Sequence, residues 1–376
     1  MLRDDGYIQA GVPWPNPRFT DHGDGTVSDN LTGLMWTKDC NTPMLGTYEP
    51  VKKKHWWSVV PKTLTPGSCE GGQMNWEKAF NYVNCLNAAN YLGHNDWRLP
   101  NINELESLLI YGRLDKDGLR DVEALPLPTI PNYWSSTTTE KDSSFAWILG
   151  NPFGAIKTKF KSLNEVCVWP VRGGQSGAFR NAALWITGQT ESYHPGDDGD
   201  VKAGVPWSNP RFTDHGDGTV SDNLTGLMWT KDANLPANSI HLRHKIVGIL
   251  DVKTSQGALE YVDTMNTGAG TYGYNDWRLP NIKEIRSLVD YSRHACALPQ
   301  EHPFINVKSN FYWSSSPCKH QFSLAWIVNM RDGRTGCGVR LGSGIEPCAE
   351  YLEGGGGNNK FYVWPVRAGV LEKGQV

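Results

Sequence analysis

The chain has 376 residues, and because single hydrophobic cores stop growing at roughly 250–300 residues, we expect two domains. Only 20% of the residues are charged, while 40 Gly, 23 Pro and 16 Trp indicate turn-rich structure with large aromatic anchors. The net charge of −3 lacks the basic excess typical of nucleic-acid-binding proteins. The sequence contains no run of about 18 consecutive apolar residues, so we predict no membrane-spanning helix.

The first predicted element is a β-hairpin in the segment RFTDHGDGTVSDNLTGLMW. Apolar Phe19, Val27 and Met35 flank Gly23-Asp24-Gly25, and Gly and Asp favour tight turns. Oxygen ligands in a tight loop can bind calcium, so we consider calcium sites formed by Asp21, Asp24 and Asp29 and by Asp214, Asp217 and Asp222. A plain hairpin turn with Asx hydrogen bonds explains the same residues, and we favour that interpretation.

Two helices follow the hairpin. Asn75 is the predicted cap of a helix from Trp76 to about Asn87, in which apolar residues recur every three to four positions. Ser255 to Met265 is its partner in the second half of the chain. A second helix begins after LPN, with Asn101 or Asn103 as its cap.

The motif DWRLPN comes just before this second helix in both halves. It places Asp96 near Arg98, and in the second half Asp276 near Arg278. We interpret each as a structural charged pair that fixes the start of the helix, because a partly buried charge is retained when it has a partner.

Three short aromatic strands complete the predicted order, namely YWSS, FAWIL and VCVWPVR. The two halves differ most in length at residues 41–73, 150–166 and 329–360, and we expect these segments to be loops because loops tolerate insertion.

The chain contains an internal repeat. Gly11 to Cys40 differs from Gly204 to Ala233 at two of thirty positions, and the later motifs recur in the same order. The offset is far longer than the roughly 20–50 residues of solenoid repeats, so we predict a duplicated globular domain. The predicted boundaries are 1–174 for the first domain, 175–198 for a linker and 199–376 for the second domain.

Each half holds four cysteines, namely Cys40, Cys69, Cys85 and Cys167 in the first and Cys296, Cys318, Cys337 and Cys348 in the second. Even numbers without a Cys-x-x-Cys motif or a zinc-like cluster favour disulfides in oxidising surroundings over metal ligation or redox catalysis. Four cysteines allow three pairings in each half, and the sequence leaves the choice open.

The ordered motifs GLMWTKD, NDWRLPNINEL, YWSS, AWI and VWPVRGG give both halves a resemblance to the Lcl C-terminal domain family of bacterial surface proteins. The resemblance implies an α+β fold of two tandem C-type-lectin-like domains, each with a β-hairpin, two helices and a short antiparallel sheet. It also implies an extracellular or cell-surface location and, as in collagen-like adhesins, binding of sulfated glycosaminoglycans. This chain departs from that pattern in its two linked copies, its extra cysteines and its lack of a collagen-like Gly-x-y tract.

Basic residues form the first candidate binding site. Lys157, Lys159 and Lys161 alternate, and a strand would place them on one face about 7 Å apart, which suits a row of sulfates or carboxylates. Arginine can hold such groups bidentately, and the corresponding region of the second half contains Arg331, Arg334 and Arg340. A solvated edge strand protected from aggregation by lysines is the alternative.

Aromatic residues divide into two classes. Ten tryptophans recur between the halves, and we assign them to the core: Trp36, Trp97, Trp134, Trp147 and Trp169, with Trp229, Trp277, Trp313, Trp326 and Trp364. Trp56 and Trp57 follow three lysines in an insertion of the first half. They are a carbohydrate or partner contact in one interpretation and loop packing in the other.

Catalysis has little support, because His22 and His215 are the only aligned histidines and no Ser/His/Asp or Cys/His constellation recurs. We expect a non-enzymatic, extracellular, adhesin-like protein that binds an anionic polysaccharide or a surface protein through variable loops, with no cofactor except the calcium considered above. Two alternatives stay open, namely a structural or assembly component of a cell-surface filament and a hypervariable ligand-display protein.

Overall fold

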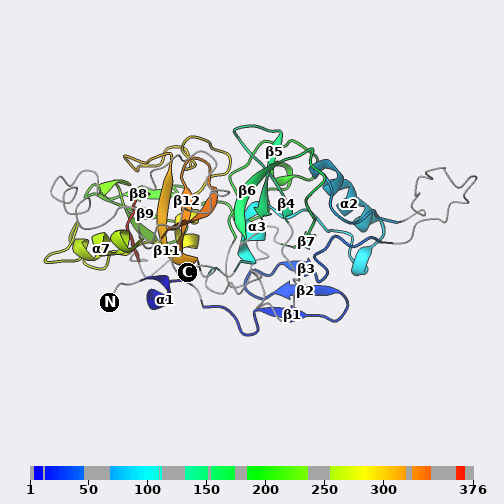
Figure 1. Cartoon of the computed structure of the whole chain (residues 1–376), viewed down its shortest axis with the longest axis horizontal. Helices are drawn as coiled ribbons and strands as arrows, with labels where there is room; N and C mark the ends of the chain where they lie inside the picture. The colour runs from blue at the N-terminus through cyan, green and yellow to red at the C-terminus, as the bar shows by residue number, and fades with distance from the viewer. Residues whose placement is uncertain are drawn as a thin grey trace, which may run out of the picture. The chain divides into compact units, whose positions relative to one another are not determined.

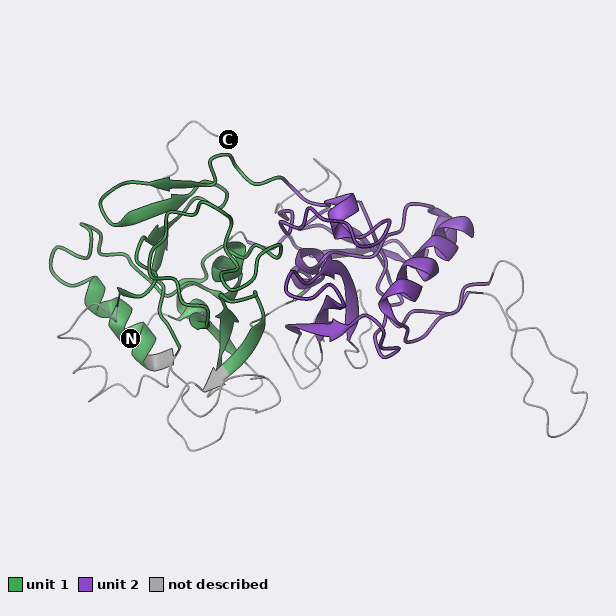
Figure 2. Cartoon of the chain, turned by 90° about the horizontal axis from the view of Figure 1, so that it is seen from above, with its two compact units in different colours: residues 1–11, 109–118, 206–376 green, residues 12–108, 119–205 purple. Residues whose placement is uncertain are grey.

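The computed structural model describes residues 4–11, 13–45, 68–109, 111, 132–150, 154–173, 184–235, 255–318, 324–339 and 361–368. The fold is α+β, with short helices and small antiparallel sheets (Figure 1). The chain forms two compact units (Figure 2). Unit 2 comprises Val12–Leu108 and Leu119–Val205 and contains the first repeat, while unit 1 comprises Met1–Gly11, Leu109–Gly118 and Pro206–Val376 and contains the second.

These units differ from the predicted domains in the segments that precede each hairpin. Residues 4–11 belong to unit 1 with the second repeat, and residues 184–205 belong to unit 2 with the first repeat. The later part of the predicted linker, residues 184–198, is therefore packed structure. It includes the start of a short helix, α4 (Asp198–Val201), whose counterpart at the start of the chain is α1 (Asp5–Ile8).

In unit 2 the predicted hairpin is confirmed. Strands β1 (Phe19–Asp21) and β2 (Thr26–Asp29) are antiparallel, and β3 (Met35–Thr37) and β7 (Val171–Arg172) extend the sheet in the order β1-β2-β3-β7. The sheet forms here because Val27 and Trp36, which lie opposite each other on β2 and β3, are both fully buried. Asp24 holds the turn, since its carboxylate accepts hydrogen bonds from the amide and the hydroxyl of Thr26.

A second sheet in unit 2 has the order β4-β5-β6, from β4 (Tyr133–Thr138), β5 (Phe145–Gly150) and β6 (Ala155–Phe160). The predicted third strand, VCVWPVR, is not the third strand of this sheet, because its last residues form β7 in the other sheet and it meets β4 at an isolated parallel bridge between Cys167 and Tyr133. Its place is taken by β6, which lies inside the predicted loop 150–166. An edge strand forms backbone hydrogen bonds with one neighbour only. Its outward side chains can therefore differ between the two repeats while the segment remains a strand.

Helices α2 (Trp76–Ala88) and α3 (Ile102–Ser107) confirm both predicted helices of the first half, and a 3₁₀ turn, η1 (Tyr91–Gly93), lies between them. Asn75 caps α2 and Asn101 caps α3, the latter in a capping box with Glu104.

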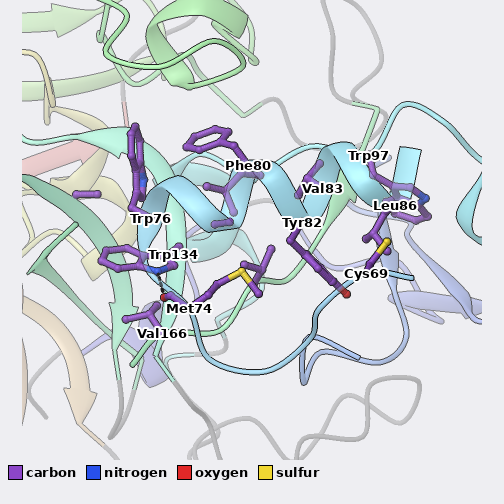
Figure 3. Packing of buried hydrophobic residues seen from close by; sticks show 14 of the residues in the cluster. Cys69, Met74, Trp76, Phe80, Tyr82, Val83, Leu86, Trp97, Trp134 and Val166 are labelled. Carbon is purple, nitrogen blue, oxygen red and sulfur yellow. Dashed lines mark hydrogen bonds between the residues drawn. The ribbon is translucent and has the colours of Figure 1, made fainter. Parts of the chain in front are cut away.

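Phe80, Val83 and Leu86 of α2 belong to one buried cluster with Trp134 and Ile148 of the second sheet. In Figure 3, Trp134 lies beside Met74 near the start of α2, and Leu86 lies beside Trp97 toward the end of the helix. Burial of each such aliphatic or aromatic side chain contributes about 1.5–3 kcal/mol, so this cluster is a substantial source of stability for unit 2.

Unit 1 repeats this order. Its first sheet is β14-β10-β9-β8, formed by β8 (Phe212–Asp214), β9 (Thr219–Asp222), β10 (Leu227–Thr230) and β14 (Val366–Ala368). Its second sheet is β11-β12-β13, formed by β11 (Phe311–Cys318), β12 (Leu324–Asn329) and β13 (Thr335–Val339), and its helices are α7 (Ser255–Met265) and α8 (Ile282–Ser287). Strand β13 lies inside the predicted loop 329–360, so that prediction is also wrong at this point, as for β6.

The ten recurring tryptophans are at most 2% exposed, which confirms their assignment to the core. Disulfides are present in both units, between Cys69 and Cys85 and between Cys318 and Cys337. Cys167 is instead a buried thiol. Cys348 lies outside the described residues.

Candidate functional site

Strand β6 carries two residues of the predicted lysine row, Lys157 and Lys159, along the edge of the β4-β5-β6 sheet. Lys157 lies opposite Ile148 and Lys159 opposite Ala146, so both lysines share a face with residues of the α2 core. Both are half-buried, which fits side chains whose aliphatic stems pack against the sheet while the amines reach outward. The predicted placement of these two lysines on one face is confirmed.

Glu165 is an internal partner of this row. The amine of Lys159 lies 2.9 Å from a carboxylate oxygen of Glu165, whose side chain is 60% exposed. Exposed ion pairs of this kind are worth about 0–1 kcal/mol, so Glu165 holds the amine of Lys159 only weakly.

Lys161 lies beyond the end of β6 and has contacts inside unit 2. Its amine lies 3.7 Å from the centre of the Trp76 ring and donates a 2.8 Å hydrogen bond to the hydroxyl of Thr138. Burial lowers the pKa of this amine to about 8. Lys161 therefore shares in the packing of the start of α2, and the surface part of the row consists of Lys157 and Lys159.

Two aromatic residues from the segment predicted to be a linker pack against Lys161 and α2. The Tyr193 ring centre lies 5.2 Å from the Lys161 amine, and the His194 ring stacks on Phe80 at 4.3 Å. Apart from the aromatic pair in TESYHPG, no sequence pattern indicates this contact, because the surrounding Gly, Pro and Asp residues are typical of surface connections.

In the second repeat, the basic candidates lie at the turn between β12 and β13. Arg331 is exposed, and Arg334 is half-buried with its guanidinium 3.2 Å from the carboxylate of Asp332. The turn therefore presents one arginine outward and holds the other against an acidic neighbour. Arg340 lies outside the described residues, as do Trp56 and Trp57.

The acidic residues of the hairpin form separate contacts. Asp21 pairs with Lys38, which lowers the pKa of Asp21, and the bonds from Thr26 lower the pKa of Asp24. Asp29 is fully buried and accepts two 2.8 Å hydrogen bonds from Arg18. Among the described residues, no three His, Cys, Asp or Glu side chains come close enough together to hold a metal ion.

The same contacts recur in the second hairpin. Asp214 pairs with Lys231, Asp217 accepts from Thr219, and Asp222 lies buried beside Arg211. The Asx turn that we favoured is therefore present in both repeats.

Ser/His and Cys/His contacts are present that the sequence did not predict. His22 Nε2 lies 2.8 Å from Ser28 Oγ on the exposed hairpin, and His215 and Ser221 repeat this distance. The β1–β2 register brings together His22 and Ser28, which are six positions apart in sequence.

In the second repeat, Cys296 Sγ lies 3.6 Å from His302 Nε2. Burial raises the pKa of this thiol and lowers the pKa of the imidazole, so both groups favour their neutral forms. A reactive thiolate needs the opposite shifts.

The predicted partners in DWRLPN are wrong. Arg98 donates at 2.6 Å to Glu104, and Asp96 instead pairs with Arg172 on β7 at 2.6 Å. The capping box turns the Glu104 carboxylate back toward the amide of Asn101, which brings it within reach of Arg98. Arg278 and Glu284 repeat this arrangement at 2.6 Å, so the expected role at the start of the helix is retained with different partners.

A model of the Lcl C-terminal domain family matches residues 25–172 and 218–367. The chain belongs to this family. Each Lcl C-terminal domain match begins inside the hairpin and ends at the last strand of the first sheet, so residues 4–11 and 184–205 lie outside both matches. A search of curated proteins and of solved structures finds no match. Within the part of the chain that the structure describes, no helix has the length and apolarity needed to cross a bilayer.

Proposed function

We propose that this protein is an extracellular, non-enzymatic, adhesin-like binding protein, and that its first repeat binds anionic glycans along β6. The observation that carries the proposal is the pair Lys157 and Lys159 on one face of an edge strand. Alternate residues of a strand are about 7 Å apart, so the two amines can contact successive anionic groups of an extended polymer.

Three further features support this proposal. The exposed Arg331 supplies a positive charge at the β12–β13 turn of the second repeat, in the region that corresponds to the lysine row. The disulfides fit an oxidising location outside the cell. The family is one of bacterial surface domains, in which a binding role needs no catalytic constellation.

The test is retention of the full chain on immobilised heparin under a rising salt gradient. We expect Lys157→Ala/Lys159→Ala to elute at clearly lower salt than the wild type, because counterion release makes polyanion binding depend on the number of neutralised charges. The matched control is Lys78→Ala/Lys141→Ala, which removes the same charge from two exposed lysines elsewhere in unit 2. A wild-type chain that is not retained, or two double variants that elute together, would contradict the proposal.

A further inference from the structure

The segments that precede the two hairpins have the same sequence pattern and the same conformation. Residues 4–11 read DDGYIQAG and residues 197–204 read DDGDVKAG. Each forms a four-residue helix with an aspartate cap, and each leaves that helix through a left-handed residue, Gln9 or Lys202, with φ of 49°. We call them the leading segments of the first and second repeats.

In unit 2, the first repeat binds the leading segment of the second repeat. The hydroxyl of Thr137 accepts a 3.0 Å hydrogen bond from the amide of Ile102 and donates a 2.7 Å hydrogen bond to the carboxylate of Asp198. The side-chain amide of Asn101 donates to the carbonyl of Ala203 at 2.9 Å. Asn101, Ile102 and Thr137 thus form one docking site.

In unit 1, the second repeat binds the leading segment of the first repeat through the equivalent residues. Ser316 accepts from the amide of Ile282 at 3.0 Å and donates to Asp5 at 2.7 Å. Asn281 donates to the carbonyl of Ala10 at 3.1 Å. The second repeat thus makes the same three hydrogen bonds as the first, with Asn281, Ile282 and Ser316 in place of Asn101, Ile102 and Thr137. Both repeats therefore dock a leading segment in the same way.

The two docking sites differ in how firmly they hold their segment. Asp198 is 2% exposed and accepts a second hydrogen bond from Thr187, and a Cβ on Gly199 would lie 2.0 Å from the carbonyl oxygen of Glu191. Thr187 and Glu191 belong to the stretch that runs into α4. In α1, Gly6 and Tyr7 are exposed, Tyr7 by 61%. The docked segment in unit 1 is therefore the easier one to release.

In each unit, the docked leading segment comes from the sequence before the other repeat. Each repeat holds the segment that leads into the other repeat, which is a head-to-tail relation. In the docking site of the second repeat, the donor Asn281 and the acceptor Ala10 are 271 positions apart in sequence. None of the contacts in this site needs the two partners to belong to one molecule, because a second copy offers identical groups.

We propose that the docking site of the second repeat, formed by Asn281, Ile282 and Ser316, is a head-to-tail assembly site that accepts residues 4–10 of a second copy of this chain in place of its own. The exchange keeps every hydrogen bond described above. Successive exchanges link chains either into closed rings or into open filaments.

Two full-length variants test this proposal by complementation. Asp5→Lys removes the acceptor for Ser316, and Ser316→Asp sets a carboxylate against Asp5, so each variant alone weakens its own docking. In a mixture, Asp5 of one chain meets Ser316 of the other, and the introduced lysine meets the introduced aspartate. We expect each variant alone to have the mass of one chain by light scattering, and the equimolar mixture to form a species of twice that mass.

The control pair carries Asp198→Lys and Thr137→Asp, the same changes at the docking site of the first repeat, and we expect no dimer from its mixture because that segment is held by additional contacts. Folded variants whose first mixture stays monomeric, or equal dimerisation of both pairs, would overturn the proposal. Should Ser316→Asp fail to fold, a synthetic peptide of residues 1–11 added to full-length Asp5→Lys gives a second test. Saturable 1:1 binding in calorimetry, lost when the peptide carries Asp5→Ala, supports the site, and no binding refutes it.

Discussion

Replacement of Asp198 by asparagine is expected to remove a large pH dependence from the stability of unit 2. Burial raises the pKa of this carboxyl from 3.8 to about 7, against the opposing effect of hydrogen bonds from Thr187 and Thr137. Because the pKa is higher in the folded state than in the unfolded state, the contribution is fully present below pH 4 and is lost as pH rises to about 7. One pKa unit corresponds to about 1.36 kcal/mol, so the loss amounts to about 4 kcal/mol.

The assay is hydrogen exchange of the most protected amides of α2, converted to a free energy of opening at several pH values between 5 and 8. The wild type should lose stability over this range. Asp198→Asn should lose much less, since the amide oxygen still accepts from both threonine hydroxyls without carrying a charge. Asp200→Asn, on the exposed side of the same helix, controls for the change in net charge. A wild type whose stability is flat or rising over this range, or an equal slope in Asp198→Asn, would refute the reasoning.

Two further substitutions test other parts of the fold. Glu104→Ala should destabilise unit 2 by about 3–5 kcal/mol in urea unfolding, because it leaves the guanidinium of Arg98 buried without its carboxylate partner; a loss below about 1 kcal/mol would contradict this. Gly199→Ala should lower the melting temperature of unit 2, because its Cβ would overlap the carbonyl of Glu191, whereas Gly6→Ala at the matching position meets its nearest atom at 3.5 Å and should have little effect. Equal melting shifts for these two alanine variants would count against the difference between the docking sites.

Short sequence patterns correctly predicted the helix starts, the hairpin turn and the buried tryptophans, because each of these depends on residues close together in the sequence. The helix capped by Asn75 begins at Trp76 as expected, because an asparagine side chain satisfies the first free amides of a helix wherever the helix lies. The hairpin turn and the ten core tryptophans followed in the same way from turn formers and from large apolar side chains.

Contacts between distant segments could not be predicted in this way. The partner of Arg98 depends on how the capping box orients Glu104, and spacing within DWRLPN carries no information about it. The alternating lysines indicated a strand, but the pairing of β6 with β5 was missed because the segment lies where the two repeats differ in length. The docking of Asp198 next to Thr137 joins residues 61 positions apart through a single pair of side chains, for which one sequence offers no periodic signal.

The near-identity of the two hairpins has a consequence for any reagent that recognises this protein. Thr20, His22 and Asp24 are exposed on the first hairpin, and Thr213, His215 and Asp217 present the same side chains on the second. An antibody raised against this turn finds two equivalent epitopes on every polypeptide. Its binding stoichiometry therefore counts hairpins rather than molecules, with two binding sites on each chain.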